Sequence, residues 1–350
     1  MKAALKTKKG EFEVKDVARP EIPHPDWVLA SVKVAGICGT DLRHWQKEEP
    51  QLECKIMGHE LAGEVLEVGP AVTHVKPGDR VVIETLLGDD TCDWCKVQQY
   101  NLCPNLYPVR METVSRAFAE NVIGPAKKFY KLPDHVSFEE ATLLDTFSVG
   151  LHAIHLSGIR VNDKVAVIGA GSIGLGQLQL AKASGADVIV TDIVDSALQL
   201  ARELGADEVV NTNTEDGLKK IMEFTGGRGV DIAFECAGGT AMPITLPQAV
   251  SFARIGGKVV IVGGFEKEQK AIELDWSRIQ MSEIQLIPSA SYSFWDIHPE
   301  MQMSLDLLAK GKLNAKKMIT HRFPLDEINK AFETARNKEE TNAVFVAITI

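Results

Sequence analysis

The feature that most constrains the fold is a glycine-rich segment that directly follows a short apolar run. The run covers residues 164–168, and the segment reads Gly169-Ala170-Gly171-Ser172-Ile173-Gly174. Gly-x-Gly-x-x-Gly between a strand and a helix is the fingerprint of a dinucleotide-binding βαβ unit. Gly169 allows the tight turn, Gly171 lets a pyrophosphate approach the backbone, and Gly174 lets helix and strand pack closely. The amides at the start of the helix, around Ser172 and Ile173, receive the phosphates.

A second part of the fingerprint is an acidic residue about twenty positions further on, at the end of the next strand. The apolar run 187–191 ends at Asp192, whose carboxylate accepts hydrogen bonds from ribose hydroxyls and repels a 2′-phosphate. No Lys or Arg occurs at positions 193–197 to favour NADP. The sequence therefore predicts NAD as the cofactor. The alternative is an ordinary strand-to-helix turn in which Asp192 caps the following helix.

The pattern around the fingerprint predicts a parallel, doubly wound sheet. Further strand-like runs at 231–235 and 258–262 alternate with helical segments, the first of them at 172–184. Residues 14–83 instead show short apolar runs broken by prolines, which is typical of irregular antiparallel β structure. Helices are expected at 301–308 and 325–335, and a final strand at 343–348 that could return to the first domain. Residues 211–216 and 338–341 are expected to be solvated loops.

Composition narrows the class of protein further. The chain has 350 residues, of which 45% are hydrophobic and 25% charged, values typical of a soluble protein with two domains. The net charge of −10 argues against nucleic acid as a partner. No apolar stretch is long enough for a membrane span or a signal peptide, so we expect a cytoplasmic protein. Six cysteines are too few for a disulfide scaffold, and clustered cysteines in a reducing compartment more often bind metal.

Two separate turns of the β-rich region carry potential zinc ligands. Cys38 lies in the segment Gly36-Ile37-Cys38-Gly39-Thr40-Asp41, and His59 lies in Gly58-His59-Glu60-Leu61-Ala62-Gly63. A thiolate and an imidazole are both common zinc ligands. Taken singly, each is more often a buried structural residue.

Together with the dinucleotide fingerprint, these motifs resemble the zinc-dependent medium-chain alcohol dehydrogenase family, in its polyol, sorbitol and threonine dehydrogenase branch. The resemblance extends over nearly the whole chain, and its other parts are Val68-Gly69, Gly78-Asp79-Arg80-Val81, Glu235-Cys236-Ala237-Gly238 and His321-Arg322-Phe323-Pro324-Leu325. It implies an α/β fold with a GroES-like, irregular β-rich catalytic domain over residues 1–150 and 289–350. Residues 151–288 would form an NAD-binding Rossmann domain.

The resemblance also implies a catalytic zinc site. Its protein ligands would be Cys38, His59 and Asp145, the last within a segment that leads into the dinucleotide domain. Members of this branch usually have glutamate at the position of Asp145, so the side chain here is one methylene shorter. Asp145 either binds zinc directly or acts through water, with Glu60 supplying the closer oxygen.

A second zinc site is implied by a cysteine cluster. Cys92, Cys95 and Cys103 resemble the last three positions of the family's four-cysteine structural zinc loop, and the first position falls on Asp89. An aspartate oxygen can complete a tetrahedral zinc site. The alternative is a loop that is empty or binds metal weakly. Cys54 and Cys236 lack metal-ligand spacing and are expected to be packing residues.

The chemistry implied by the resemblance is zinc-assisted hydride transfer from an alcohol to NAD. Thr40 would accept the substrate proton, or alternatively its hydroxyl only satisfies a turn beside Cys38. Arg43 stands where many members have the outer relay histidine, and an arginine cannot shuttle protons near neutrality. Either the neighbouring His44 takes the relay, or protons leave through cofactor hydroxyls and water. Arg43 would bind a cofactor phosphate, bind a substrate anion, or be solvated.

The expected substrate is a small secondary alcohol, namely a polyol, cyclitol or sugar. The alternatives are L-threonine 3-dehydrogenase-type activity and a catalytically silent NAD-binding protein. Three aromatic residues either line a pocket for the apolar face of a ring or belong to the core, namely Trp45, Tyr292 and Trp295. A homodimer or homotetramer is implied, with dinucleotide domains paired through the strand near residues 285–287.

Overall fold

The computed structural model describes residues 1–48, 56–106, 116–266 and 271–350. The chain divides into two compact units. Unit 1 comprises Met1–Asp145, Asp296–Ala309 and Ala315–Ile350, and unit 2 comprises Thr146–Trp295 and Lys310–Asn314. None of the helices in the described ranges is long and apolar enough to cross a membrane. Cys54, which we expected to be a packing residue, lies outside the described residues.

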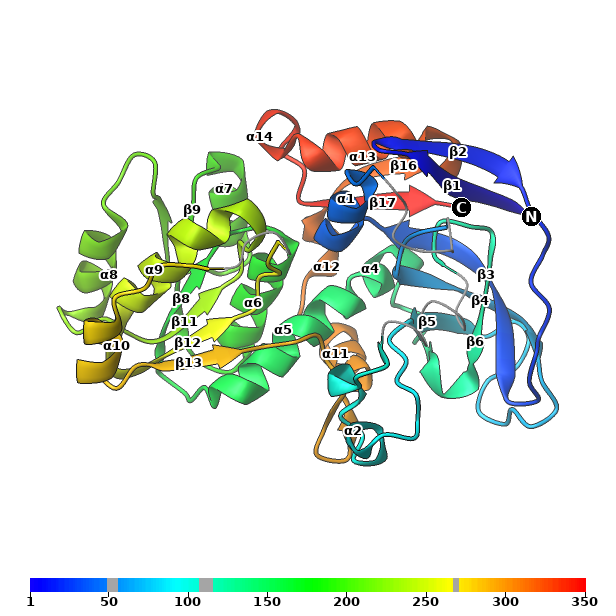
Figure 1. Ribbon diagram of the computed structural model, residues 1–350, viewed down its shortest axis with the longest axis horizontal. Helices are drawn as coiled ribbons and strands as arrows, with labels where there is room; N and C mark the ends of the chain where they lie inside the picture. The colour runs from blue at the N-terminus through cyan, green and yellow to red at the C-terminus, as the bar shows by residue number, and fades with distance from the viewer. Residues whose placement is uncertain (49–55, 107–115, 267–270) are drawn as a thin grey trace. The chain divides into compact units, whose positions relative to one another are not determined.

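Unit 2 contains a six-stranded parallel sheet with the strand order β10-β9-β8-β11-β12-β13 (Figure 1). Its strands are β8 (Lys164–Ile168), β9 (Asp187–Asp192), β10 (Glu208–Asn211), β11 (Val230–Glu235), β12 (Ala253–Ile261) and β13 (Gln285–Pro288). The chain reverses its direction of travel across the sheet between β8 and β11, and the crevice beyond the carboxyl ends of such strands binds ligands in doubly wound folds. The predicted parallel sheet is confirmed, whereas the short strand β10 was not predicted.

Helices pack on this sheet through apolar faces. α6 packs on β8 and β9, and α9 packs on β11 and β12. Leu175, Leu178 and Leu180 of α6 are almost fully buried, in agreement with the apolar faces expected for this segment. The helices of this part of the chain are α5 (Leu144–Ser157), α6 (Ser172–Ala183), α7 (Asp195–Glu203), α8 (Gly217–Thr225), η3 (Gly239–Ala241), α9 (Met242–Phe252) and α10 (Trp276–Met281), and the short strand β14 (Phe294–Trp295) follows.

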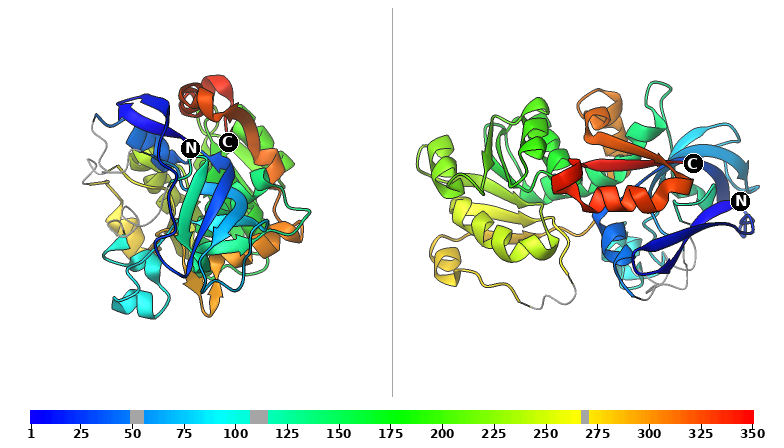
Figure 2. Two further views of the ribbon diagram at one scale, coloured as in Figure 1. Left: turned by 90° about the vertical axis from the view of Figure 1, so that its right-hand side faces the viewer. Right: turned by 90° about the horizontal axis from the view of Figure 1, so that it is seen from above.

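Unit 1 contains a seven-stranded sheet in which β16-β17-β3-β4-β5-β7 are neighbours and β6 also pairs with β3. Its strands are β3 (Trp27–Gly36), β4 (Glu60–Val68), β5 (Arg80–Glu84), β6 (Asn121–Pro125), β7 (Phe129–Lys131), β16 (Ile319–Pro324) and β17 (Phe345–Thr349), beside a hairpin of β1 (Lys2–Lys8) and β2 (Glu11–Asp16). The C-terminal strand β17 runs antiparallel to β3, so the tail returns to the N-terminal part of the chain as expected. The two termini consequently lie close together (Figure 2).

The helical elements of unit 1 are mostly short. They are α1 (Gly39–Trp45), α2 (Asp93–Lys96), η1 (Tyr100–Leu102), η2 (Ala126–Lys128), α4 (Phe138–Thr142), α11 (Glu300–Ala309), α12 (Ala315–Met318), η4 (Leu325–Glu327), α13 (Ile328–Arg336) and α14 (Lys338–Thr341), with the short strand β15 (His298–Pro299) before α11. The expected loop at 338–341 is thus a one-turn helix. Trp45 is buried in the core, 5.5 Å from the Phe332 ring, so it does not line a pocket.

Candidate active site and metal centres

Strand register in unit 1 brings the first cluster of metal donors together. Cys38 follows the end of β3, His59 directly precedes β4, and Glu60 is the first residue of β4. β3 and β4 are antiparallel, and Gly36 pairs with Glu60. As a result, one ligand atom from each of Cys38, His59 and Glu60 lies within 4.8 Å of the others. A thiol, an imidazole and a carboxylate at this separation suit a zinc ion.

Gly36 leaves space for the carboxylate of Glu60. Glu60 is 3% exposed, and a Cβ atom on Gly36 would lie 2.5 Å from its Oε2. A side chain at position 36 would therefore overlap both the Phe345 ring and the Glu60 carboxylate. Gly36 is the last residue of β3 and is paired with Glu60 in the ordinary way. The glycine there therefore serves the close approach of neighbouring side chains and not an unusual backbone conformation.

Asp41 orients this cluster, although it is not among the site residues predicted from the sequence. Its Oδ2 accepts a hydrogen bond from the Cys38 backbone N–H at 3.1 Å, and its Oδ1 lies 3.5 Å from His59 Nδ1. Burial lowers the pKa of His59, but Asp41 and Cys38 together raise that pKa well above its usual value. A carboxylate behind a metal-binding histidine fixes the ring orientation. In the sequence, the feature that points to Asp41 is its position three residues after Cys38 at the start of a helix.

The structure does not place Asp145 with the other predicted catalytic-zinc ligands. Asp145 lies in the first turn of α5, and among the described residues the group within 4.8 Å contains only Cys38, His59 and Glu60. Its direct ligation therefore remains a prediction.

Helix α1 carries Thr40 and His44, the two predicted proton-transfer candidates, together with Arg43. Arg43 Nη2 donates a hydrogen bond to Thr40 Oγ1 at 2.9 Å, so the hydroxyl is held by the arginine. Burial is the main cause that lowers the pKa of His44 to about 4, so this imidazole is neutral near pH 7. In the part of the chain that the structure describes, no hydrogen bond joins Thr40 to His44.

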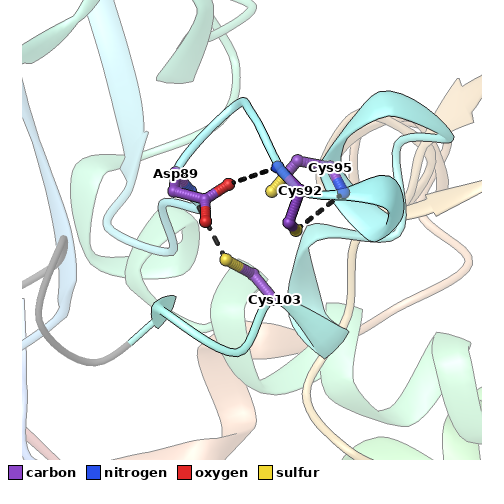
Figure 3. A group of neighbouring side chains, drawn as sticks. All are labelled: Asp89, Cys92, Cys95 and Cys103. Atoms are coloured by element: carbon purple, nitrogen blue, oxygen red, sulfur yellow. Dashed lines mark hydrogen bonds between the residues drawn. The ribbon is translucent and has the colours of Figure 1, made fainter.

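The second donor cluster forms within one loop of unit 1 (Figure 3). Ligand atoms of Asp89, Cys92, Cys95 and Cys103 all lie within 4.8 Å of one another. Cys92 Sγ accepts the Cys95 N–H, and Cys103 Sγ accepts the Asp89 N–H, both at 3.4 Å. A Cβ atom on Gly88 would overlap Cys95 Sγ, which explains the glycine there. We call residues 88–105 the cysteine lobe.

The carboxylate of Asp89 is held in place by neighbours in the cysteine lobe. Its Oδ1 accepts the Thr91 and Cys92 N–H groups, both at 2.9 Å, and its Oδ2 accepts Asn105 Nδ2 at 2.7 Å. These hydrogen bonds, those from the Cys92 and Thr91 backbones first, hold its pKa well below the usual range. Burial and the neighbouring Cys92 raise the pKa of Cys95 to about 12 in the metal-free protein. Three sulfurs and one ionised oxygen form a donor set that fits zinc.

A buried polar network ties the cysteine lobe to the sheet. Glu84, at the end of β5, accepts hydrogen bonds at Oε1 from Tyr100 OH at 2.7 Å and Lys128 Nζ at 2.6 Å. Its Oε2 accepts Tyr130 OH at 2.9 Å. Burial, followed by the Glu84 charge, raises the pKa of both tyrosines. The four residues come from distant segments with no recognisable spacing, so the sequence does not predict this network.

In unit 2, the glycine-rich loop has the backbone geometry that the fingerprint predicts. Gly169 has φ of 95°, and a Cβ there would lie 2.8 Å from the Ala237 nitrogen, just beyond β11. A Cβ on Gly174 would overlap the Gly169 carbonyl oxygen. At Gly171, no atom lies within 4 Å of the Cβ position, so the backbone is open to a ligand. Helix α6 begins at Ser172 and Ile173 directly after this opening.

Asp192 ends β9 beside this loop. Its Oδ2 accepts the Ala170 N–H at 2.5 Å, and its Oδ1 accepts the Ile193 and Val194 N–H groups at 2.7 and 2.9 Å. The carboxylate thus lies against the loop that would receive the pyrophosphate. These hydrogen bonds stabilise the loop.

Comparison with known proteins identifies the family. The chain is 34% identical over 344 residues to the sorbitol dehydrogenase of Bacillus subtilis strain 168, covering 96% of this chain and 93% of that protein. It is 37% identical over 333 residues to the D-arabitol-phosphate dehydrogenase of Enterococcus avium, with coverage of 93% and 91%. Residues 24–134 match the alcohol dehydrogenase GroES-like domain, and residues 172–310 match the zinc-binding dehydrogenase family. The chain belongs to the zinc-dependent alcohol dehydrogenase family.

A solved structure of this family supports the fold and the cofactors. A protein described as a zinc-binding dehydrogenase from Sinorhizobium meliloti 1021, bound to NADP, matches with a TM-score of 0.90 and 30% identity, covering 100% of this chain and 99% of that one. The predicted combination of a GroES-like β-rich domain and a Rossmann sheet is confirmed. Membership of this family supports zinc and a nicotinamide dinucleotide as the cofactors. It also supports the conclusion that the chain is an enzyme with a small-molecule substrate.

Proposed function

We propose that this family member is an NAD-dependent dehydrogenase that oxidises a secondary alcohol of a polyol, cyclitol or sugar. The observation that carries the proposal is the meeting of Cys38, His59 and Glu60 at the start of α1, two residues from the Thr40 hydroxyl. The names of the relatives, a sorbitol dehydrogenase and a D-arabitol-phosphate dehydrogenase, support a hydroxyl-rich substrate.

The residues that would hold the catalytic zinc are Cys38, His59 and Glu60, with Asp145 as the further candidate. Bound zinc supplies Lewis acidity, which lowers the pKa of an alcohol and stabilises the alkoxide. Asp41 keeps the His59 ring in its orientation, and Thr40 Oγ1 receives the alcohol proton. Because its pKa is lowered, His44 is a weak proton acceptor. We therefore favour cofactor hydroxyls and water over His44 as the outer path for the proton.

The structural metal role of the cysteine lobe is also a proposal. Asp89, Cys92, Cys95 and Cys103 surround one position with four donors, which is the ligand number of a closed structural zinc site. In unit 2, we propose that Gly169, Gly171 and Gly174, with the amides of Ser172 and Ile173, receive the pyrophosphate of NAD. Asp192 would accept the ribose hydroxyls through its remaining lone pairs and disfavour NADP.

The proposal also covers the oligomeric state, the cellular location and the domain bounds of the enzyme. β13 is the end strand of the described six-stranded sheet, and its backbone can pair with a second copy. We propose a homodimer or homotetramer built on this pairing, in the cytoplasm. We also propose that residues 1–150 and 289–350 form the catalytic domain and residues 151–288 the NAD-binding domain.

The test is NADH formation with sorbitol, arabitol, myo-inositol, L-threonine and 2-butanol, together with zinc analysis of the same sample. We expect oxidation of one hydroxyl-rich class, abolished in Cys38→Ala and kept in the control Cys236→Ala, whose sulfur is buried outside the donor clusters. Oxidation of L-threonine alone would favour the threonine dehydrogenase alternative. NAD binding without oxidation of any alcohol would favour the catalytically silent alternative.

A further inference from the structure

Arg43 is folded back toward the start of helix α1. Its Nη2 reaches Thr40 Oγ1, and its Nη1 lies 4.0 Å from the position that a Cβ atom on Gly39 would occupy. Gly39 and Thr40 are the two residues that directly follow the metal donor Cys38. The half-buried guanidinium therefore lies over the first turn of α1, beside the residues where the alcohol would bind.

The guanidinium has no carboxylate partner among the residues that the structure describes. The nearest acidic residue along α1 is Asp41, and its two oxygens face the Cys38 N–H and the His59 ring. A guanidinium carries five N–H donors, and among the described residues only the contact with Thr40 uses one of them. Within that part of the chain, four donors therefore remain for an anion, in the planar arrangement that matches phosphate or carboxylate oxygens.

We propose that Arg43 binds an anionic group, a phosphate ester or a carboxylate, on the hydroxyl-rich substrate whose reacting alcohol lies at Thr40 and Cys38. This inference rests on the proposed function and names its substrate class more closely. The guanidinium donates a hydrogen bond to Thr40 on one side and can donate others to an anion on its opposite side. The anion and Thr40 are then separated by the guanidinium and one further hydrogen bond, a distance that a short polyol chain can span. Arg43 is thus a specificity-determining residue.

The experiment compares each free polyol with its phosphate ester, sorbitol with sorbitol 6-phosphate and arabitol with arabitol 5-phosphate. The variants are Arg43→Gln, Arg43→Lys and the control Arg19→Gln, whose side chain pairs with Glu67 in an exposed salt bridge. Initial rates give kcat and KM for each alcohol and for NAD. Calorimetry measures the binding of sorbitol 6-phosphate directly, so the contact is tested even in a sample that does not turn over.

We expect the native enzyme to prefer the esters. In Arg43→Gln, kcat/KM for the ester should fall by about 10- to 100-fold, mostly through KM, as for loss of a charge-assisted hydrogen bond. Arg43→Lys should give an intermediate kcat/KM for the ester, because lysine keeps the positive charge but lacks the planar pair of N–H donors. Loss of the Thr40 contact affects ester and free polyol equally, so the ratio of their kcat/KM values isolates the anion. Arg19→Gln should match the native enzyme.

Three results would overturn the inference. The first is a native enzyme that neither prefers nor binds the ester although it oxidises free polyols, which leaves the proposed function intact. The second is an equal loss for ester and free polyol in Arg43→Gln, which would limit Arg43 to positioning Thr40. The third is a raised KM for NAD with every alcohol, which would assign the guanidinium to a cofactor phosphate. Failure of all alcohols would count against the proposed function, and calorimetry would still decide the anion contact.

Discussion

The two donor clusters of unit 1 have similar ligand chemistry but are assembled in different ways. The cysteine lobe collects Asp89, Cys92, Cys95 and Cys103 from one continuous loop, stabilised by local hydrogen bonds between those residues. The active-site cluster joins Cys38 to His59 and Glu60 through the pairing of β3 with β4. A local cluster can be identified from spacing alone, whereas a cluster made by strand register depends on the whole sheet.

The clusters also differ in completeness. The cysteine lobe offers four donors around one position, and the active-site group offers three. Structural zinc sites are closed by four protein ligands, while catalytic sites keep a position open for substrate. On the proposed function, we therefore expect changes in the cysteine lobe to affect stability and changes in the active-site cluster to affect activity. Mutations should separate these two effects.

The largest expected effect is on activity. His59→Ala should lower kcat/KM by about 10³-fold or more, because the Lewis acidity worth several kcal/mol is lost with the metal. The zinc content should fall by about half, since the lobe site remains. Steady-state kinetics and metal analysis check both. His74→Ala is the control, because His74 bonds the Ala126 carbonyl outside both clusters. Equal loss of zinc from both sites would contradict the separation.

A large effect on stability is expected from the lobe. Cys103→Ala should lower the free energy of unfolding by about 4 kcal/mol when zinc is at 1,000 times its Kd for the native lobe. The reason is that metal bound only to the folded state stabilises that state. Urea unfolding with and without a chelator measures this. If Cys103→Ala unfolds like the native protein at saturating zinc, the lobe does not bind zinc structurally.

A smaller effect is expected from the buried network below the lobe. Tyr100→Phe should lower the free energy of unfolding by about 1–3 kcal/mol, because Glu84 loses a buried hydrogen-bond donor. The substitution should also weaken zinc binding by the cysteine lobe, since Tyr100 is part of that lobe. Tyr130→Phe is the matched control, which removes a donor to the same carboxylate from β7. Competition with a zinc chelator should show a change for Tyr100→Phe and none for Tyr130→Phe.

The smallest expected effect concerns pH. The pKa of Asp89 is lowered in the folded state, so its ionised form stabilises the metal-free lobe above the unfolded pKa of about 4. That contribution is lost as pH falls from about 4 through the folded pKa. The difference in urea midpoint between metal-free native protein and Asp89→Asn should therefore shrink below pH 4. A difference that stays constant between pH 3 and pH 6 would show that the Asp89 charge has no role.

Prediction from sequence succeeded where structure is local or periodic. The run 164–168 followed by three glycines predicts strand, turn and helix together, and the structure has each of them in place. It failed where one side chain meets another from a distant segment. The sequence left Trp45 open between a substrate pocket and the core, and packing against Phe332 places it in the core. The contact of Asp41 with His59 and the Glu84 network also join side chains from distant segments, and the sequence predicted neither of them.

The sequence by itself determined the parallel dinucleotide-binding sheet, the candidate metal donors and the family resemblance, because these depend on residue type and short motifs. Only the tertiary structure decided which donors meet. It brought Glu60 to Cys38 through strand register, set Asp41 behind His59 and turned Arg43 onto Thr40. The physical reason is that side-chain distances across strands and turns depend on the register and burial of the whole domain, which no short segment of sequence specifies.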